Sequence, residues 1–111
     1  MHFIFTVGPV IEDFKFDGKL QAGMRTRIYC NVAQGDLPLT ITWLKDGKPL
    51  NQLNDPLAKV SIREMDQFSK ALLMEQLSPV NNGNYTCQVS NDAATVTHSA
   101  QLIVNGKQKT L

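Results

Sequence analysis

The sequence predicts an all-β fold in which two antiparallel sheets pack face to face, and three observations support this. Short runs of alternating apolar and polar residues recur along the 111-residue chain, separated by turn-forming Gly, Pro, Asn and Asp. No helical period of any length interrupts these runs. A single pair of cysteines, Cys30 and Cys87, has the only tryptophan, Trp43, between its members. Packing two sheets together buries one side of every such strand.

The residues around the cysteines narrow the fold to an immunoglobulin-like sandwich. A Cys, a later Trp, and a second Cys preceded two residues earlier by a Tyr form the spacing of that architecture; here they are Cys30, Trp43, Cys87 and Tyr85. We expect one inter-sheet disulfide, worth about 4 kcal/mol in the chain-entropy model and typical of an oxidising compartment. Trp43 should pack in the core, and Tyr85 should form a tyrosine corner. All four residues have structural roles.

Short strands are expected in order along the chain, each ending at a turn signal, of which Asp46-Gly47 is the strongest. A C′ strand without a C″ strand, together with a split A and A′ strand, indicates the intermediate set, with sheets ABED and A′GFCC′. The expected strands are A (residues 9–16), A′ (19–22), B (24–33), C (39–45), C′ (48–50), D (60–64), E (69–77), F (83–91) and G (93–104), with a loop at 51–56.

The chain is long enough for one domain, expected at residues 9–104. Residues 1–8 are interpreted as a vector-derived start or the remnant of a signal peptide, and residues 105–111 as a linker or tail. Eleven basic and ten acidic residues give a net charge of +1 without a basic run. This charge pattern argues against nucleic acid and membrane surfaces as partners, and no apolar run is long enough to span a bilayer.

No group of residues predicts catalysis or cofactor binding. His2 and His98 have no Cys, Asp or Glu at metal-ligand spacing around them. The carboxylates are scattered over turns and outer strand faces, and neither a nucleophile-elbow serine nor a glycine-rich phosphate loop occurs. We therefore expect a protein that is not an enzyme and that binds no metal or cofactor.

One N-x-T sequon, Asn84-Tyr85-Thr86, overlaps the predicted tyrosine corner. Such triplets also arise by chance, and this one has a role in the fold in any case. Because Tyr85 should face inward, Asn84 should point outward from strand F. A glycan on Asn84 would shield the sheet that contains C, F and G and leave the ABED sheet bare.

The ABED sheet contains a break in the alternation of apolar and polar residues. In residues 71–74 the core positions are Leu72 and Met74, so Leu73 is expected to face outward in the middle of a central strand. Single exposed apolar residues are normal on protein surfaces, and that is one interpretation. The other is a self-complementary patch with a mixed-charge rim, as a twofold interface needs.

Strand pairing predicts the members of this patch. Leu73 and Ala71 should neighbour Tyr29 on one side and Ser61 or Arg63 on the other, because strand E lies between B and D. The rim is then made of charged residues from the same face. The full candidate set is Arg25, Arg27, Tyr29, Ser61, Arg63, Ala71, Leu73 and Glu75.

Two segments carry a more specific resemblance. Residues 35–50, GDLPLTITWLKDGKPL, and residues 68–104, FSKALLMEQLSPVNNGNYTCQVSNDAATVTHSAQLIV, resemble the arthropod Dscam (Down syndrome cell adhesion molecule) family. The resemblance is strongest to its alternatively spliced seventh immunoglobulin domain and to the related N-terminal domain of the shortened chelicerate forms. It implies a glycoprotein ectodomain of a single-pass cell-surface protein, with isoform-specific homophilic recognition.

The resemblance also implies how recognition works. In that family two copies meet antiparallel, about a twofold axis, through the ABED face, which nominates the candidate set above, with Glu12 and Lys15 of strand A as further members. The partner is then a second copy of the chain, held in a weak homodimer. Arg63 facing Glu75 of that copy would attract, whereas a charged residue facing its own copy would repel.

Two other functions are compatible with the same fold. A heterophilic receptor module would bind a ligand through loops at one end of the sandwich, chiefly residues 34–38 and 91–93, which are short and lack aromatic anchors. A structural spacer, including an intracellular muscle-type sandwich, would bind nothing through either sheet. Two reactive thiols in the native protein would argue against an extracellular location.

Overall fold

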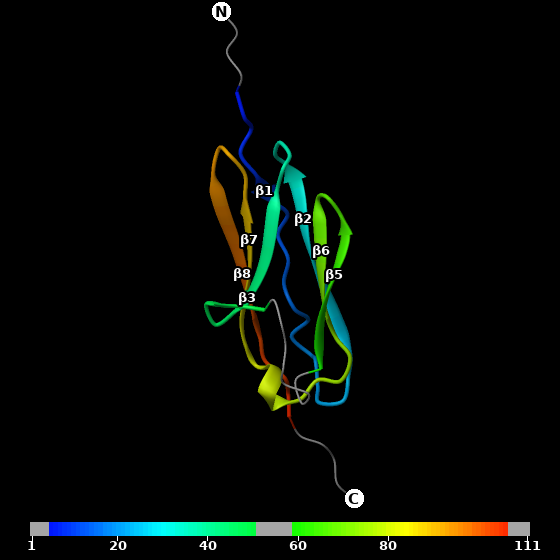
Figure 1. Cartoon of the computed structure of the whole chain (residues 1–111). Coiled ribbons are helices and arrows are strands. Elements are labelled where there is room, and N and C mark those ends of the chain that lie inside the picture. The colour runs from blue at the N-terminus through cyan, green and yellow to red at the C-terminus, as the bar shows by residue number, and fades with distance from the viewer. Residues whose placement is uncertain (1–4, 51–58, 107–111) are drawn as a thin grey trace, which may run out of the picture.

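The computed structural model describes residues 5–50 and 59–106, which form two packed antiparallel sheets (Figure 1). The strands are β1 (Val10–Ile11), β2 (Thr26–Gln34), β3 (Thr40–Lys45), β4 (Lys48–Pro49), β5 (Val60–Asp66), β6 (Ser69–Met74), β7 (Gly83–Ser90) and β8 (Thr95–Leu102), with a 3₁₀ turn, η1 (Pro79–Asn81), before β7. One sheet has the order β1-β2-β6-β5 and the other β4-β3-β7-β8. These orders confirm the predicted ABED and GFCC′ sheets. The predicted loop at 51–56, His2 and residues 107–111 lie outside the described residues.

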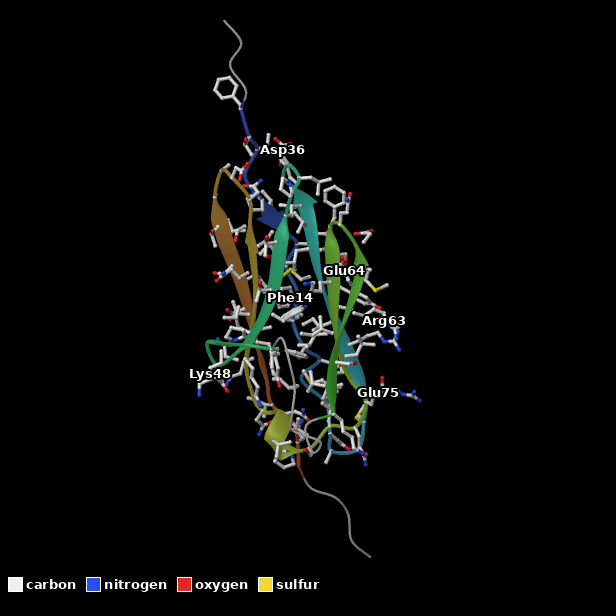
Figure 2. The ribbon with its side chains drawn as sticks, viewed as in Figure 1. Phe14, Asp36, Lys48, Arg63, Glu64 and Glu75 are labelled. Carbon is white, nitrogen blue, oxygen red and sulfur yellow. A yellow bond between two sulfur atoms is a disulfide. The ribbon has the colours of Figure 1, made fainter. Side chains whose placement is uncertain are left out.

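The predicted A strand is much shorter than expected, because the chain leaves the first sheet after Glu12 and crosses to the second, where Phe14 packs against His98. The ring of Phe14 turns inward and lies 5.2 Å from the ring of Trp43, between the two sheets (Figure 2). The predicted A′ strand is a single parallel bridge between Gln21 and Asn105. Asn105, expected in the tail, is therefore hydrogen-bonded to the body of the domain.

Strand ends differ from the prediction where side chains or turns intervene. β6 ends at Met74 rather than residue 77, where the chain bends towards η1. β8 begins at Thr95 rather than residue 93, because Asn91 Oδ1 accepts hydrogen bonds from the amides of Ala93 and Ala94, at 2.9 and 3.2 Å, and holds them in a turn. β5 continues to Asp66, through an irregularity that the alternation did not reveal.

The core is built around the disulfide between Cys30 and Cys87, which links the two sheets as predicted. Both cysteines are fully buried and Trp43 is 1% exposed. Ile28, Val32, Ile41 and Leu72 are buried beside them, so the predicted inward sides of the strands are confirmed. The Asp46-Gly47 turn has positive φ at both residues (50° and 83°), the geometry of a type I′ hairpin.

A lysine also joins the two sheets, which the sequence analysis did not anticipate. Lys70 lies on the inward side of β6, where its Nζ donates to the carbonyl of Ile41 on β3 at 2.7 Å. In return, Trp43 Nε1 donates to the carbonyl of Lys70 at 3.1 Å. Two reciprocal hydrogen bonds thus tie β3 to β6 and fix the separation of the outer faces.

The tyrosine corner is confirmed. Tyr85 is fully buried, and its hydroxyl donates to the carbonyl of Asn81 in η1 at 2.6 Å. Burial raises the pKa of Tyr85 well above its ordinary value, the nearby carboxylate of Asp46 raises it further, and the hydrogen bond with Asn81 acts in the opposite direction. The hydroxyl therefore stays protonated and keeps its structural bond over the physiological range.

Candidate functional site

The ABED face is the outer surface of β2, β6 and β5 with the residues that flank them. The observed register places Ala71 between Tyr29 and Arg63, and Leu73 between Arg27 and Ser61. The prediction placed Tyr29 beside both central residues, and the register assigns it to Ala71. The face therefore has two small or apolar positions along its central strand, with longer side chains on both neighbouring strands.

The predicted exposed apolar patch is wrong. Leu73 is only 9% exposed and Ala71 only 1%, although neither belongs to the cluster between the sheets. Both lie on the outward side of β6 and are nevertheless buried, with Tyr29 and Arg63 beside Ala71 and with Arg27 and Ser61 beside Leu73. Leu73 therefore offers little of its own surface to a partner.

The exposed part of the ABED face is charged and aromatic. Tyr29 is 38% exposed, and Arg27, Arg63, Ser61 and the flanking Arg25 and Glu75 are exposed. Figure 2 shows Arg63 and Glu75 on the side of β5 and β6, away from β3 and β7. Met65, at the irregularity near the end of β5, is 50% exposed. Met65 lies beyond the end of the predicted strand, which was expected to stop at residue 64.

Strand A contributes less to this face than predicted. The amide of Glu12 donates to the carbonyl of Asn31 on β2 at 2.9 Å, so Glu12 still lies beside the ABED sheet. Lys15 comes after the crossing and lies in a groove with Phe14, His98 and Ser99. Because His98 and Ser99 belong to β8 of the other sheet, Lys15 is not part of the ABED face.

The outer surface of β3, β7 and β8, here called the GFC face, differs from the ABED face in composition. Alternation from buried Trp43, Cys87 and Leu102 identifies its outward residues. None of these residues carries a charge, and all but one are polar. They are Thr40, Thr42, Leu44, Asn84, Thr86, Gln88, Ser90, Thr95, Thr97, Ser99 and Gln101. Asn84 is exposed on this face, as predicted.

The loops proposed for heterophilic binding are held by the chain's own N-terminal segment. The amide of Val7 donates to Asp36 Oδ2 at 2.8 Å, and the amide of Asp36 donates to the carbonyl of Val7 at 3.0 Å. Asn91 Nδ2 donates to both carbonyls, at 2.7 Å (Val7) and 3.1 Å (Asp36). Residues 34–38 and 91–93 thus already have an occupant, and Val7 is part of the folded unit.

His98 has a structural environment. Its Nε2 lies 3.0 Å from the carbonyl oxygen and 3.2 Å from the amide nitrogen of Phe14, and its ring packs edge-on against Phe14 at 4.4 Å. Across residues 5–50 and 59–106, no three His, Cys, Asp or Glu side chains cluster as metal ligands would. Within the same residues, no helix is long and apolar enough to cross a membrane.

Sequence comparison finds relatives among the cell adhesion molecules. The sequence is 44% identical to the cell adhesion molecule DSCAM of Gallus gallus and 43% identical to that of Homo sapiens, each over 94% of this chain. It is 43% identical to the cell adhesion molecule Dscam2 of Drosophila melanogaster over 88% of the chain. The chain spans only 4–5% of the length of these relatives.

Solved structures share the fold. The Dscam1 Ig7 domain, isoform 9, superposes with a TM-score of 0.78 at 26% identity, covering 88% of this chain and 100% of that one. The titin M3 domain superposes with a TM-score of 0.74 at 25% identity, covering 90% of this chain and 99% of that one. The resemblance to the Dscam family stated from the sequence is confirmed. Because the sequence matches the immunoglobulin I-set domain over residues 9–104, the chain belongs to the immunoglobulin I-set domain family.

Proposed function

We propose that the chain is an extracellular cell-adhesion module that binds a second copy of itself through the ABED face. The observation that carries this proposal is the 43–44% identity to cell adhesion molecules of the DSCAM kind over most of the chain. The titin domain has the same fold, so the fold alone does not separate adhesion from a spacer role. Sequence similarity favours adhesion.

The chemistry of the ABED face is suited to a weak, selective contact. Tyr29 supplies an exposed aromatic anchor above the small Ala71, and aromatic and arginine side chains are the residue types enriched at interface centres. Specificity comes from the charges around this centre.

A twofold axis determines which charges meet. A residue near the axis faces its own copy, whereas two residues at opposite distances from it face each other twice. We place Arg63 of one copy opposite Glu75 of the other, so that both crossed pairs attract. A variant chain with either charge reversed would then repel its own kind, which is a means of distinguishing isoforms.

The matched pair Arg63→Glu and Thr97→Glu tests this interface. Both place a carboxylate on an exposed strand residue, one on the ABED face and one on the GFC face. Sedimentation equilibrium should show at least about a tenfold weaker dimer for Arg63→Glu, equal to roughly 1.4 kcal/mol, and no change for Thr97→Glu. Equal dimerisation of both variants would contradict the ABED interface.

The proposed extracellular location rests on the disulfide as well as on the relatives. Across the residues that the structure describes, no cysteine is free, and the bond between Cys30 and Cys87 needs an oxidising compartment to persist. The native protein isolated from its source should show no titratable thiol before denaturation and reduction. Two reactive thiols in the native protein would place the domain inside the cell.

A further inference from the structure

The GFC face combines an uncharged surface with a sequon. Its outward residues are threonines, serines and amides, with Leu44 as the only apolar one, and hydroxyls pair across strands, as between Thr86 Oγ1 and Ser99 Oγ at 2.7 Å. Charge repulsion is what normally keeps exposed sheets from associating non-specifically. On this face that protection must come from something other than its own side chains.

Asn84 is placed to supply such cover. It lies on β7 opposite Gln101 of β8, and its side chain is exposed on the uncharged face. The inward neighbour Tyr85 belongs to the tyrosine corner, so the orientation of Asn84 is fixed by the most buried part of the domain. A group attached to Asn84 Nδ2 would extend over β7 and β8, away from the ABED face.

We propose that Asn84 is N-glycosylated and that its glycan covers the GFC face, which confines self-association to the ABED face. In the transfer, Asn84 Nδ2 forms a bond to the anomeric carbon of the first sugar of a lipid-linked oligosaccharide. The bond from that carbon to the pyrophosphate oxygen breaks, the lipid pyrophosphate leaves, and the amide nitrogen loses a proton. The neutral sugar hydroxyls match the hydroxyl and amide groups of the face beneath.

The folded structure indicates when this transfer takes place. Asn84 is held by its backbone, since its amide donates to Asp46 Oδ1 at 2.9 Å and its carbonyl accepts from the amide of Asp46 at 2.8 Å. The hydroxyl of Thr86, which completes the sequon, is engaged with Ser99. The sequon must therefore be modified before β7 pairs with its neighbours, during synthesis in the secretory pathway.

Intact mass measures occupancy directly, and this step depends on the proposed extracellular location but not on dimerisation. The chain secreted from animal cells should carry an added mass that peptide N-glycosidase removes. Thr86→Ser keeps both the hydroxyl and the sequon and should retain the mass, whereas Asn84→Gln and Thr86→Ala should lose it. An unmodified secreted chain would overturn the proposal.

One substitution provides a control on the opposite face. Asn31 lies on the outer side of β2, and Ala33→Thr at an exposed residue completes a sequon there. A33T secreted from the same cells should carry a second glycan, which shows that the transferase modifies strand sequons in this fold. Occupancy at Asn31 with none at Asn84 would overturn the proposal for Asn84.

Dimerisation then separates this proposal from the proposed function. The glycosylated chain should stop at the dimer, whereas Asn84→Gln should form the same dimer and associate further through its uncovered GFC face. A33T should dimerise when made in bacteria and not when glycosylated. If the glycan on Asn84 itself blocks the dimer, its placement away from the contact is wrong. If the glycan on Asn31 leaves the dimer intact, the ABED interface fails while the measured occupancy of Asn84 stands.

Discussion

The ABED and GFC faces lie on the same sandwich and follow the same alternation, yet they differ in what their outward residues rest on. On the ABED face, exposed Arg27, Tyr29 and Arg63 flank two nearly buried residues, Ala71 and Leu73. On the GFC face, threonines, serines and amides cover the strands, and Asn84 lies at the start of β7 on its exposed side. We call the ABED face two-layered, because exposed side chains there flank outward residues that are nearly buried. We call the GFC face single-layered, because its outward residues are themselves partly or fully exposed.

This difference shows how a sheet surface can be specialised without changing the fold. Long charged side chains beside a buried leucine give a surface on which a charge reversal changes which partner fits. Short uncharged side chains give a flat surface with little to discriminate between partners. Recognition is therefore expected on the layered face, and cover on the flat one.

The largest effect should come from the disulfide that holds the two faces in one unit. Replacing Cys30 and Cys87 together with alanine should lower the free energy of unfolding by about 4 kcal/mol, because the unfolded chain regains loop entropy. Urea unfolding of the double variant against the parent measures this. A loss of less than about 1 kcal/mol would show that packing around Trp43 and the hydrogen bonds of Lys70 hold the sheets together without the disulfide.

Next comes a leucine comparison between the faces. Leu73→Ala should destabilise the fold by about 2–3 kcal/mol, since it opens space beneath the side chains of β2 and β5. Leu44→Ala, at a half-buried outward site between Thr86 and Pro49, should cost about 1 kcal/mol. Denaturant unfolding of both variants measures the two losses of stability. Equal losses would contradict the two-layer description of the ABED face.

A smaller loss of stability is expected from the tyrosine corner. Tyr85→Phe removes the bond to the Asn81 carbonyl and should cost about 1–2 kcal/mol at pH 7. The raised pKa means that this contribution is complete below the ordinary tyrosine pKa of about 10 and is lost as pH rises beyond it, because the unfolded chain then releases its proton first. The stability difference between parent and variant should shrink from pH 9 to pH 11.

That shrinkage is specific to Tyr85. All other ionisable groups are present in both proteins, so their contributions cancel in the difference. A difference that stays constant to pH 11 would show that burial does not hold the phenol in its protonated form.

Most of the fold could be predicted from the sequence, because the alternation of apolar and polar residues and the spacing of Cys30, Trp43 and Tyr85 both indicate which residues are buried. Strand lengths were less accessible, since β1 ends where Phe14 turns inward and β8 begins where Asn91 holds a turn, and both depend on contacts between distant segments. Period two from Leu72 does place Lys70 inward, so that signal was present, but its partner Ile41 lies on another sheet.

For the candidate site, the sequence predicted which way each side chain points but not how much of it is exposed. Alternation correctly turned Leu73 outward, yet its burial depends on the lengths of the side chains that the register brings beside it. The exposure of Met65 was not predicted, because the pairing irregularity near the end of β5 cannot be read from the alternation. Register and side-chain length together decide which outward residues a partner can reach.

Charge reversal on both sides of the proposed crossed pair tests the central claim most directly. Arg63→Glu and Glu75→Arg should each abolish or strongly weaken the homodimer, because like charges then meet twice. Mixed in equal amounts, the two variants should form a heterodimer close to the parent in affinity, since the substituted position 63 of one chain meets the substituted position 75 of the other. Sedimentation equilibrium of the mixture showing only monomers, while the parent dimerises, would contradict this pairing on the ABED face.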